Sequence, residues 1–261
     1  ISRYINNKKN KNYKANDVII GPGTKELMFL LQTLFEGDIL LPIPSWVSYA
    51  PQAMIAKNKV HWINTLSENN WFPSANEIEK VILKNKDKKY LLFLNSPNNP
   101  SGQICSNLKE ISDIAKKYDI IILSDEIYSE LNFSENFKSI SDYYPDKTII
   151  SSGLSKWCGA GGWRLGYFII PDSLGDINKM INVLVTRDSM THEEAEAYRK
   201  KKAAEEKAKG ETKNEGAFGG PGGNWDKEGP GVPTSDDYTD EDVDGRLREV
   251  RSQLNSIIEW I

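Results

Sequence analysis

Short, uninterrupted apolar runs alternate with segments of helical spacing from the start of the chain to about Thr186, and this alternation constrains the fold most. Val18–Ile20 is such a run, and the leucines between Leu27 and Leu34 then recur at helical spacing. An uninterrupted apolar run is typical of a strand that is covered on both faces. The pattern therefore predicts an α/β fold in which helices flank a mostly parallel sheet.

Further runs predict the rest of this sheet and its helices. We expect strands at Asp38–Leu41, Val60–Ile63, Tyr90–Leu94, Ile120–Leu123, Thr148–Ser151 and Gly166–Ile170. We expect helices at Trp46–Ala56, from Ser74 (with Glu77 at capping-box spacing) to about Lys84, from Ser106 to about Lys117, and from a cap at Asp172 past Met180. Ligands of such sheets bind at loops beyond the carboxyl ends of the strands. The polar motifs that follow the strands are therefore the candidate site.

The composition changes abruptly after Thr186. Between Met190 and Val232 the chain has no Ile, Leu, Val or Met, and charged runs lead into a Gly- and Pro-rich stretch. Such a segment buries too little apolar surface to offset the entropy lost on ordering. We expect a folded domain at 1–186, a largely disordered linker at 187–242 and a short amphipathic helix at 243–261.

Charge and composition exclude several classes of function. A formal net charge of -4 offers no basic surface for nucleic acid. No apolar run is long enough to span a bilayer. The two cysteines, Cys105 and Cys158, and the two histidines, His61 and His192, lack metal-ligand spacing. We therefore expect free thiols, no metal, no nucleic-acid or membrane partner, and a cytoplasmic protein.

A glycine-rich loop after Thr148–Ser151 carries a lysine and an arginine. Ser155 and Lys156 precede Arg164 in this loop. A lysine amine forms a Schiff base with an aldehyde, and the planar guanidinium of arginine suits a phosphate. The loop therefore has the groups to hold a cofactor that carries both, although two solvated loop charges would also explain the pair.

Two upstream stretches have features that a cofactor of this kind needs. Gly23, Thr24 and Lys25 lie between a strand and a helix, where free amides can hold a phosphate. An ordinary turn with Thr24 as the N-cap is the alternative. A Gly-Lys-Ser/Thr ending is lacking, which disfavours ATP and GTP. Trp46 follows the next strand, where it can stack on a flat ring or serve as an ordinary core or surface aromatic.

Turn-forming residues follow the strand Tyr90–Leu94. In Asn95–Gly102, two prolines bracket an asparagine pair, and we expect a cis bond before Pro100. A rigid loop at a strand end suits Asn99 for donating a hydrogen bond to a phenolic oxygen. A simple turn would also explain the composition, but not why two prolines bracket the asparagine pair.

An acidic residue follows the strand Ile120–Leu123. Asp125 lies where a carboxylate is unfavourable unless it is paired, and a protonated pyridine nitrogen is a suitable partner. Tyr128 lies three residues later, within reach of the same ring. The alternative is an aspartate that caps the next turn.

Together these groups meet the needs of pyridoxal 5'-phosphate. From about Ile1 to Thr186 the chain resembles the large domain of the class I/II aminotransferases, the aspartate-aminotransferase-like family of fold type I. The lysine loop, the Asn-Asn-Pro-Ser-Gly stretch and the Asp-Glu-Ile-Tyr stretch carry this resemblance.

The resemblance implies a role for each candidate residue. Lys156 would form the Schiff base and move the substrate proton, and Asp125 would keep the pyridine nitrogen protonated. Tyr128 and Asn99 would bind the phenolic oxygen, and Trp46 would stack on the ring. The phosphate would be held by Gly23, Thr24, Lys25, Ser155 and Arg164. Where many relatives have a serine three residues before the lysine, this chain has Gly153.

The implied activity is transfer of an amino group between an amino acid and a 2-oxo acid by a homodimer. A lyase, decarboxylase or racemase with the same cofactor is an alternative. A catalytically inactive, truncated or chimeric fragment is another, because Ile1–Tyr4 resembles a helix end from the middle of the family's N-terminal region. Likewise, no family-like small domain with a carboxylate-binding arginine is recognisable after Thr186.

Overall fold

One mixed sheet forms the centre of the fold. The structure is a computed structural model that describes residues 1–9, 11–84, 87–132 and 137–186. The strands are β1 (Val18–Gly21), β2 (Asp38–Ile43), β3 (Val60–Asn64), β4 (Tyr90–Asn95), β5 (Ile121–Asp125), β6 (Thr148–Gly153) and β7 (Gly166–Ile169). Within the described residues they form a 7-stranded sheet in the order β1-β7-β6-β5-β4-β2-β3. In this sheet β7 pairs antiparallel with β1 and β6, and the other pairs are parallel, so the mostly parallel α/β sheet is confirmed.

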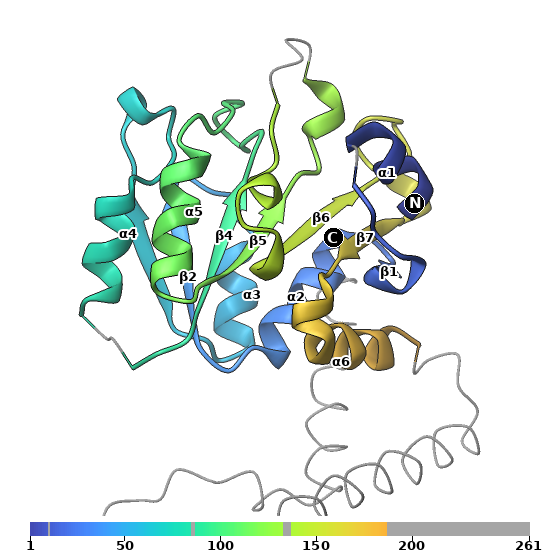
Figure 1. Cartoon of the computed structure of the whole chain (residues 1–261), viewed down its shortest axis with the longest axis horizontal. Helices are drawn as coiled ribbons and strands as arrows, with labels where there is room; N and C mark the ends of the chain where they lie inside the picture. Colours follow the sequence, from blue (N-terminus) through green and yellow to red (C-terminus); the bar gives the residue numbers. More distant parts are fainter. Residues whose placement is uncertain (10, 85–86, 133–136, 187–261) are drawn as a thin grey trace, which may run out of the picture. The chain divides into compact units, whose positions relative to one another are not determined.

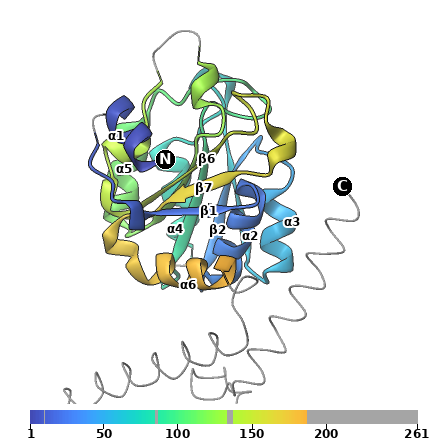
Figure 2. The same cartoon turned by 90° about the vertical axis from the view of Figure 1, so that its right-hand side faces the viewer.

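Helices cover both faces of this sheet (Figures 1 and 2). They are α1 (Ser2–Lys9), α2 (Thr24–Leu34), α3 (Tyr49–Ile55), α4 (Ala75–Ile82), α5 (Leu108–Lys117) and α6 (Gly175–Thr186). Alternate residues of β4 enter different cores: Phe93 packs in a cluster with α2, α3 and α6, and Leu92 packs in a cluster with α4 and α5. A third cluster joins α1 to β6 and β7. Strands buried on both faces explain the uninterrupted apolar runs.

Three helices begin later than the sequence predicts. We expected a helix from Trp46, but α3 begins at Tyr49, which places Pro51 in the first turn. A proline is tolerated there because first-turn N–H groups have no acceptor within the helix, so its missing N–H costs no helix hydrogen bond. The helix predicted from Ser106 begins at Leu108, and the one predicted from Asp172 begins at Gly175 after a 3-10 turn. By contrast, Ser74 caps α4 as predicted, because its hydroxyl accepts the N–H of Glu77 at 3.3 Å.

Two predictions lie outside the described residues, namely the linker at 187–242 and the helix at 243–261. Among the described residues, no helix has the length and apolarity needed to cross a membrane. Both cysteines are free thiols, Cys105 buried and Cys158 exposed.

Candidate active site

The predicted site residues gather at one edge of the sheet. Strands β2, β4, β5 and β6 are parallel, so their carboxyl ends meet at the same edge (Figure 1). Trp46 follows β2, Asn99 follows β4, Asp125 ends β5 and Lys156 follows β6. The register places Asn95 beside Asp125, and Asp125 beside Ser151. Motifs far apart in sequence therefore come together at the location where ligands of parallel sheets bind.

The carboxylate of Asp125 is buried and is hydrogen-bonded by a tyrosine. Its exposed fraction is 5%. The Tyr49 hydroxyl donates to Oδ2 at 2.5 Å, and the N–H of Ile127 donates to Oδ1 at 3.3 Å. Burial raises the pKa of Asp125 to about 6, and the hydrogen bond from Tyr49 opposes that rise. A carboxylate oxygen can accept a further hydrogen bond, so Asp125 can still bind a cationic N–H.

Tyr49 is a further residue of this site, and no sequence motif predicts it. Its ring packs edge-on against Trp46, with centroids 5.3 Å apart, and against Phe93 at 4.9 Å. Burial raises the pKa of Tyr49 well above its usual value, so the hydroxyl keeps its proton and acts as a donor. No local pattern separates this tyrosine from an ordinary core aromatic, because its acidic partner lies 76 residues away in the sequence.

Asn99, Tyr128 and Lys156 also come together. The Asn99 side-chain amide donates to the Tyr128 hydroxyl at 3.4 Å. The Lys156 ammonium nitrogen lies 5.6 Å from the centroid of the Tyr128 ring. Asn95 secures the loop, because it accepts the Asn99 N–H at 2.7 Å and donates to the Asp125 carbonyl at 2.9 Å. The peptide bond between Asn99 and Pro100 is cis, as predicted.

A second group of residues surrounds the N-terminus of α2. Gly23 is the N-cap, so the alternative with Thr24 as the cap is wrong. Arg164 reaches this turn, and its Nη2 donates to the Pro22 carbonyl at 3.3 Å. A Cβ on Gly23 would lie 2.3 Å from that nitrogen, and its φ of 99° also favours glycine. No side chain caps the helix, so first-turn amides remain available for an anion.

Two cations, Lys25 and Arg164, lie at this helix end. In the part of the chain that the structure describes, no ion pair joins Lys25 or Arg164 to a carboxylate. The Lys25 nitrogen lies 5.4 Å from the centroid of the Trp46 ring. Desolvation, and next the positive charge of Arg164, lower the pKa of Lys25. Such a pair of cations beside a helix N-terminus fits a phosphate dianion.

The remaining predicted residue, Ser155, lies half-buried in the turn after β6, directly before Lys156. The glycine at position 153 also has a structural reason. A Cβ on Gly153 would lie 2.7 Å from the Leu165 carbonyl, at the place where β6 pairs with β7. Close backbone approach therefore favours glycine at this position.

Comparison with known proteins assigns the family. The family model described as aminotransferase class I and II matches residues 1–199, and the chain belongs to this family. An aspartate aminotransferase of Bacillus sp. (strain YM-2) is 38% identical over 164 residues, which cover 59% of this chain and 41% of that protein. Aromatic-amino-acid aminotransferase 2 of Thermococcus litoralis is 34% identical over 170 residues, covering 63% of this chain and 42% of that protein.

Solved structures agree with the sequence comparison. The crystal structure of aspartate aminotransferase from Thermotoga maritima has a TM-score of 0.65 at 29% identity, and the match covers 72% of this chain and 50% of that one. The chain spans less than half the length of the curated relatives it matches. The site described above belongs to this shared portion of the family fold.

Proposed function

We propose that this chain is the cofactor-binding part of an aminotransferase that moves an amino group between an amino acid and a 2-oxo acid. Pyridoxal 5'-phosphate is the cofactor, and Lys156 is the residue that binds it covalently. One observation carries the proposal: Asp125, Asn99, Tyr128 and Lys156 meet at the carboxyl edge of parallel strands. The names of the relatives, aspartate and aromatic-amino-acid aminotransferases, support it.

The groups present fit the cofactor at both of its ends. Asp125 is a buried acid with room for one more donor, which suits a protonated ring nitrogen. The cations Lys25 and Arg164, together with the amides after Gly23, suit the phosphate. Pyridoxal phosphate supplies a ring that withdraws electrons from the α-carbon of a bound substrate.

The chain's own residues have separate tasks in this proposal. Asp125 holds the proton on the ring nitrogen, because an ion pair with a buried carboxylate favours the charged form of both groups. Tyr49 orients that carboxylate through its hydroxyl. Lys156 takes a proton from the substrate α-carbon and returns it, as a general base that becomes a general acid.

The other residues bind and orient the cofactor. Tyr128 and Asn99, which already contact each other, donate to its phenolic oxygen. Trp46 stacks on the ring and excludes water from one face. The phosphate is held by Gly23, Thr24, Lys25, Ser155 and Arg164. The proposal also includes that the protein is a homodimer in the cytoplasm. Light scattering of the purified full chain tests the oligomeric state of the protein.

Borohydride trapping tests the covalent attachment. The full chain is mixed with pyridoxal phosphate, reduced, digested and mapped by mass spectrometry. We expect the label on the peptide that contains Lys156, loss of this label in Lys156→Ala, and no loss in Lys109→Ala, a matched change on the exposed side of α5. A label on another lysine, or an equal label in Lys156→Ala, would contradict the proposal.

Product analysis tests the reaction. With an amino acid and a 2-oxo acid present, we expect the matching new amino acid and new 2-oxo acid in equal amounts. Release of carbon dioxide or of ammonia without amino transfer would instead identify a decarboxylase or a lyase on the same cofactor site.

A further inference from the structure

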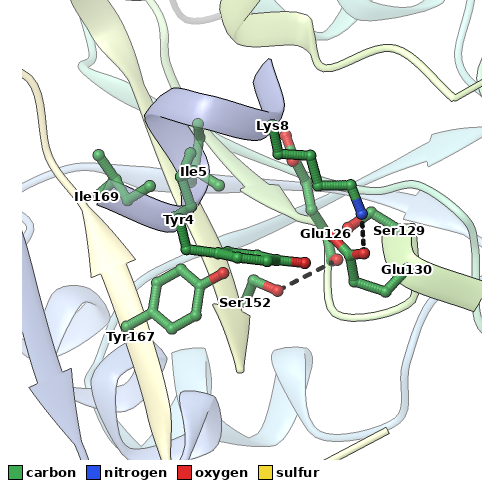
Figure 3. A pocket seen from close by; sticks show the side chains of 10 residues that line it. Tyr4, Ile5, Lys8, Glu126, Ser129, Glu130, Ser152, Tyr167 and Ile169 are labelled. Atoms are coloured by element: carbon green, nitrogen blue, oxygen red, sulfur yellow. Dashed lines mark hydrogen bonds and ion pairs between the residues drawn. The ribbon is translucent and has the colours of Figure 1, made fainter. Parts of the chain in front are cut away.

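Helix α1 lies against the sheet beside the candidate site. Ile5, with an exposed fraction of 4%, packs in a small cluster with Ile150, Tyr167 and Ile169 of β6 and β7. A narrow pocket remains between the helix and the sheet, and its lining includes Tyr4, Lys8 and Ser152. Figure 3 shows Tyr4 extending from α1 toward Ser152 and Glu126, and Lys8 extending toward Glu130.

Two side chains of α1 contact the loops that carry site residues. The Tyr4 ring stacks on Trp157, the neighbour of Lys156, with centroids 6.4 Å apart and planes 2° from parallel. Lys8 forms an ion pair with Glu130 (Figure 3), two residues after Tyr128. The hydrogen bond from Lys8 to Glu130 is also the main cause that raises the pKa of Lys8. Helix α1 therefore contacts both the loop that carries Lys156 and the segment that follows Tyr128.

The lysine loop has little support of its own. Residues 156–159 are all exposed, and three glycines follow within the next residues, at positions 159, 161 and 162. Glycine has the greatest backbone freedom and offers no side chain for packing. The loop's internal hydrogen bonds are short-range: Cys158 Sγ donates to the Leu154 carbonyl at 2.9 Å, the Gly159 N–H to the Lys156 carbonyl at 3.3 Å, and Arg164 Nη1 to the Gly161 carbonyl at 2.9 Å. Contacts from outside the loop therefore add to these short-range bonds in holding Lys156 in place.

We propose that α1 positions the lysine loop: the stack of Tyr4 on Trp157 and the ion pair of Lys8 with Glu130 hold Lys156 close to Tyr128. Tyr4, Trp157 and Lys8 are positioning residues in this scheme, because they act through Lys156 and Tyr128. The consequence for cofactor binding rests on the proposed function, but the consequence for loop order does not.

Hydrogen exchange of the cofactor-free full chain tests loop order. We expect Tyr4→Ala to speed amide exchange in residues 154–162 by about 3- to 10-fold, the effect of losing one aromatic pair. Tyr4→Phe keeps the ring and should exchange like the wild type. Trp62→Ala removes a half-exposed ring from the edge strand β3 and is the matched control. Unchanged exchange in Tyr4→Ala would overturn the proposal.

Trp157→Ala provides a second test of the stack in case Tyr4→Ala unfolds the whole domain. It removes the same stack but makes no change within α1, so exchange should rise in the loop and stay unchanged in β5. Lys8→Gln should speed exchange near residues 128–131, whereas Lys109→Gln, which removes an exposed ion pair within α5, should not. If amide exchange rises neither in the lysine loop nor near residues 128–131, the proposed positioning role of α1 is refuted.

Cofactor binding supplies the second readout. Tyr4→Ala and Trp157→Ala should each weaken pyridoxal phosphate binding by about 3- to 10-fold, and the double variant should be no weaker than either single variant. Additive losses would mean that the two rings act separately, which contradicts the proposal. Absence of binding in the wild type would instead refute the proposed function, and the exchange experiment would still decide the role of α1.

Discussion

The hydroxyl of Tyr49 donates a 2.5 Å hydrogen bond to Oδ2 of Asp125, and both side chains are buried, with exposed fractions of 1% and 5%. Tyr49 lies in the first turn of α3 and Asp125 is the last residue of β5. The pair thus connects a helix on one face of the sheet to the strand end where the cofactor nitrogen is expected. A fixed donor on one carboxylate oxygen directs the acid toward its next partner.

Tyr49→Phe should raise the pKa of Asp125 further. Burial raises this pKa, and the hydrogen bond from the Tyr49 hydroxyl lowers it. Without the hydroxyl, burial should therefore raise the pKa of Asp125 further. We also expect the free energy of unfolding to fall by about 1–3 kcal/mol, the range for a hydrogen bond to a buried charged group. A carbon-13 NMR titration of the Asp125 carboxyl group measures the pKa. Tyr118→Phe, which removes a surface hydroxyl bonded to Glu79, is the control and should leave the Asp125 titration unchanged.

Asp125→Asn should stabilise the cofactor-free chain above pH 6 while weakening cofactor binding. The folded pKa of Asp125 is about 6, above its ordinary value of 3.8, so the folded state binds more protons between these values. Stability contributed by this group is therefore present at low pH and lost as the pH rises through about 6, by up to ~3 kcal/mol. The free energy of unfolding, measured with denaturant from pH 4 to 8, should change less with pH in the variant than in the wild type. An identical profile would mean that Asp125 does not carry this pH dependence.

Lys25→Gln should weaken binding of inorganic phosphate and of pyridoxal phosphate. Desolvation and Arg164 lower the pKa of Lys25, so an arriving dianion should raise it again and take up protons. In the wild type, the affinity for both phosphate ligands should therefore fall as the pH rises through the lowered pKa of Lys25. The variant should lack this part of the pH dependence. Calorimetric titration at several pH values measures both effects. Lys109→Gln should retain the affinity of the wild type.

Gly23→Ala should displace Arg164 and destabilise the turn before α2. The new methyl group would lie 2.3 Å from the Arg164 Nη2, at a φ of 99° that L-residues rarely adopt. We expect a loss of about 1–3 kcal/mol in the free energy of unfolding, together with weaker phosphate binding. Gly162→Ala is the matched control, because a Cβ there has no neighbour within 4 Å. Equal stability of the two variants would argue against a backbone conformation at Gly23 that favours glycine.

Much of this architecture could be predicted from local pattern. Continuous apolar runs such as Tyr90–Leu94 predict buried parallel strands, because such strands are covered on both faces and have no polar side. Motifs at or just after strand ends, such as those of Asp125 and Asn99, could also be assigned to a common edge, since parallel strands end on the same side. Helix starts were less predictable: the position of α3 depends on where Pro51 can be accommodated.

Contacts between distant segments were decided by the tertiary structure. The Tyr49–Asp125 bond, the approach of Arg164 to Pro22 and the stack of Tyr4 on Trp157 join residues that share no local pattern. Periodicity reports which side of an element is buried, because burial of apolar surface acts on each element separately. It does not report which buried or loop side chains meet, because that depends on the register of the whole sheet and the packing of helices upon it.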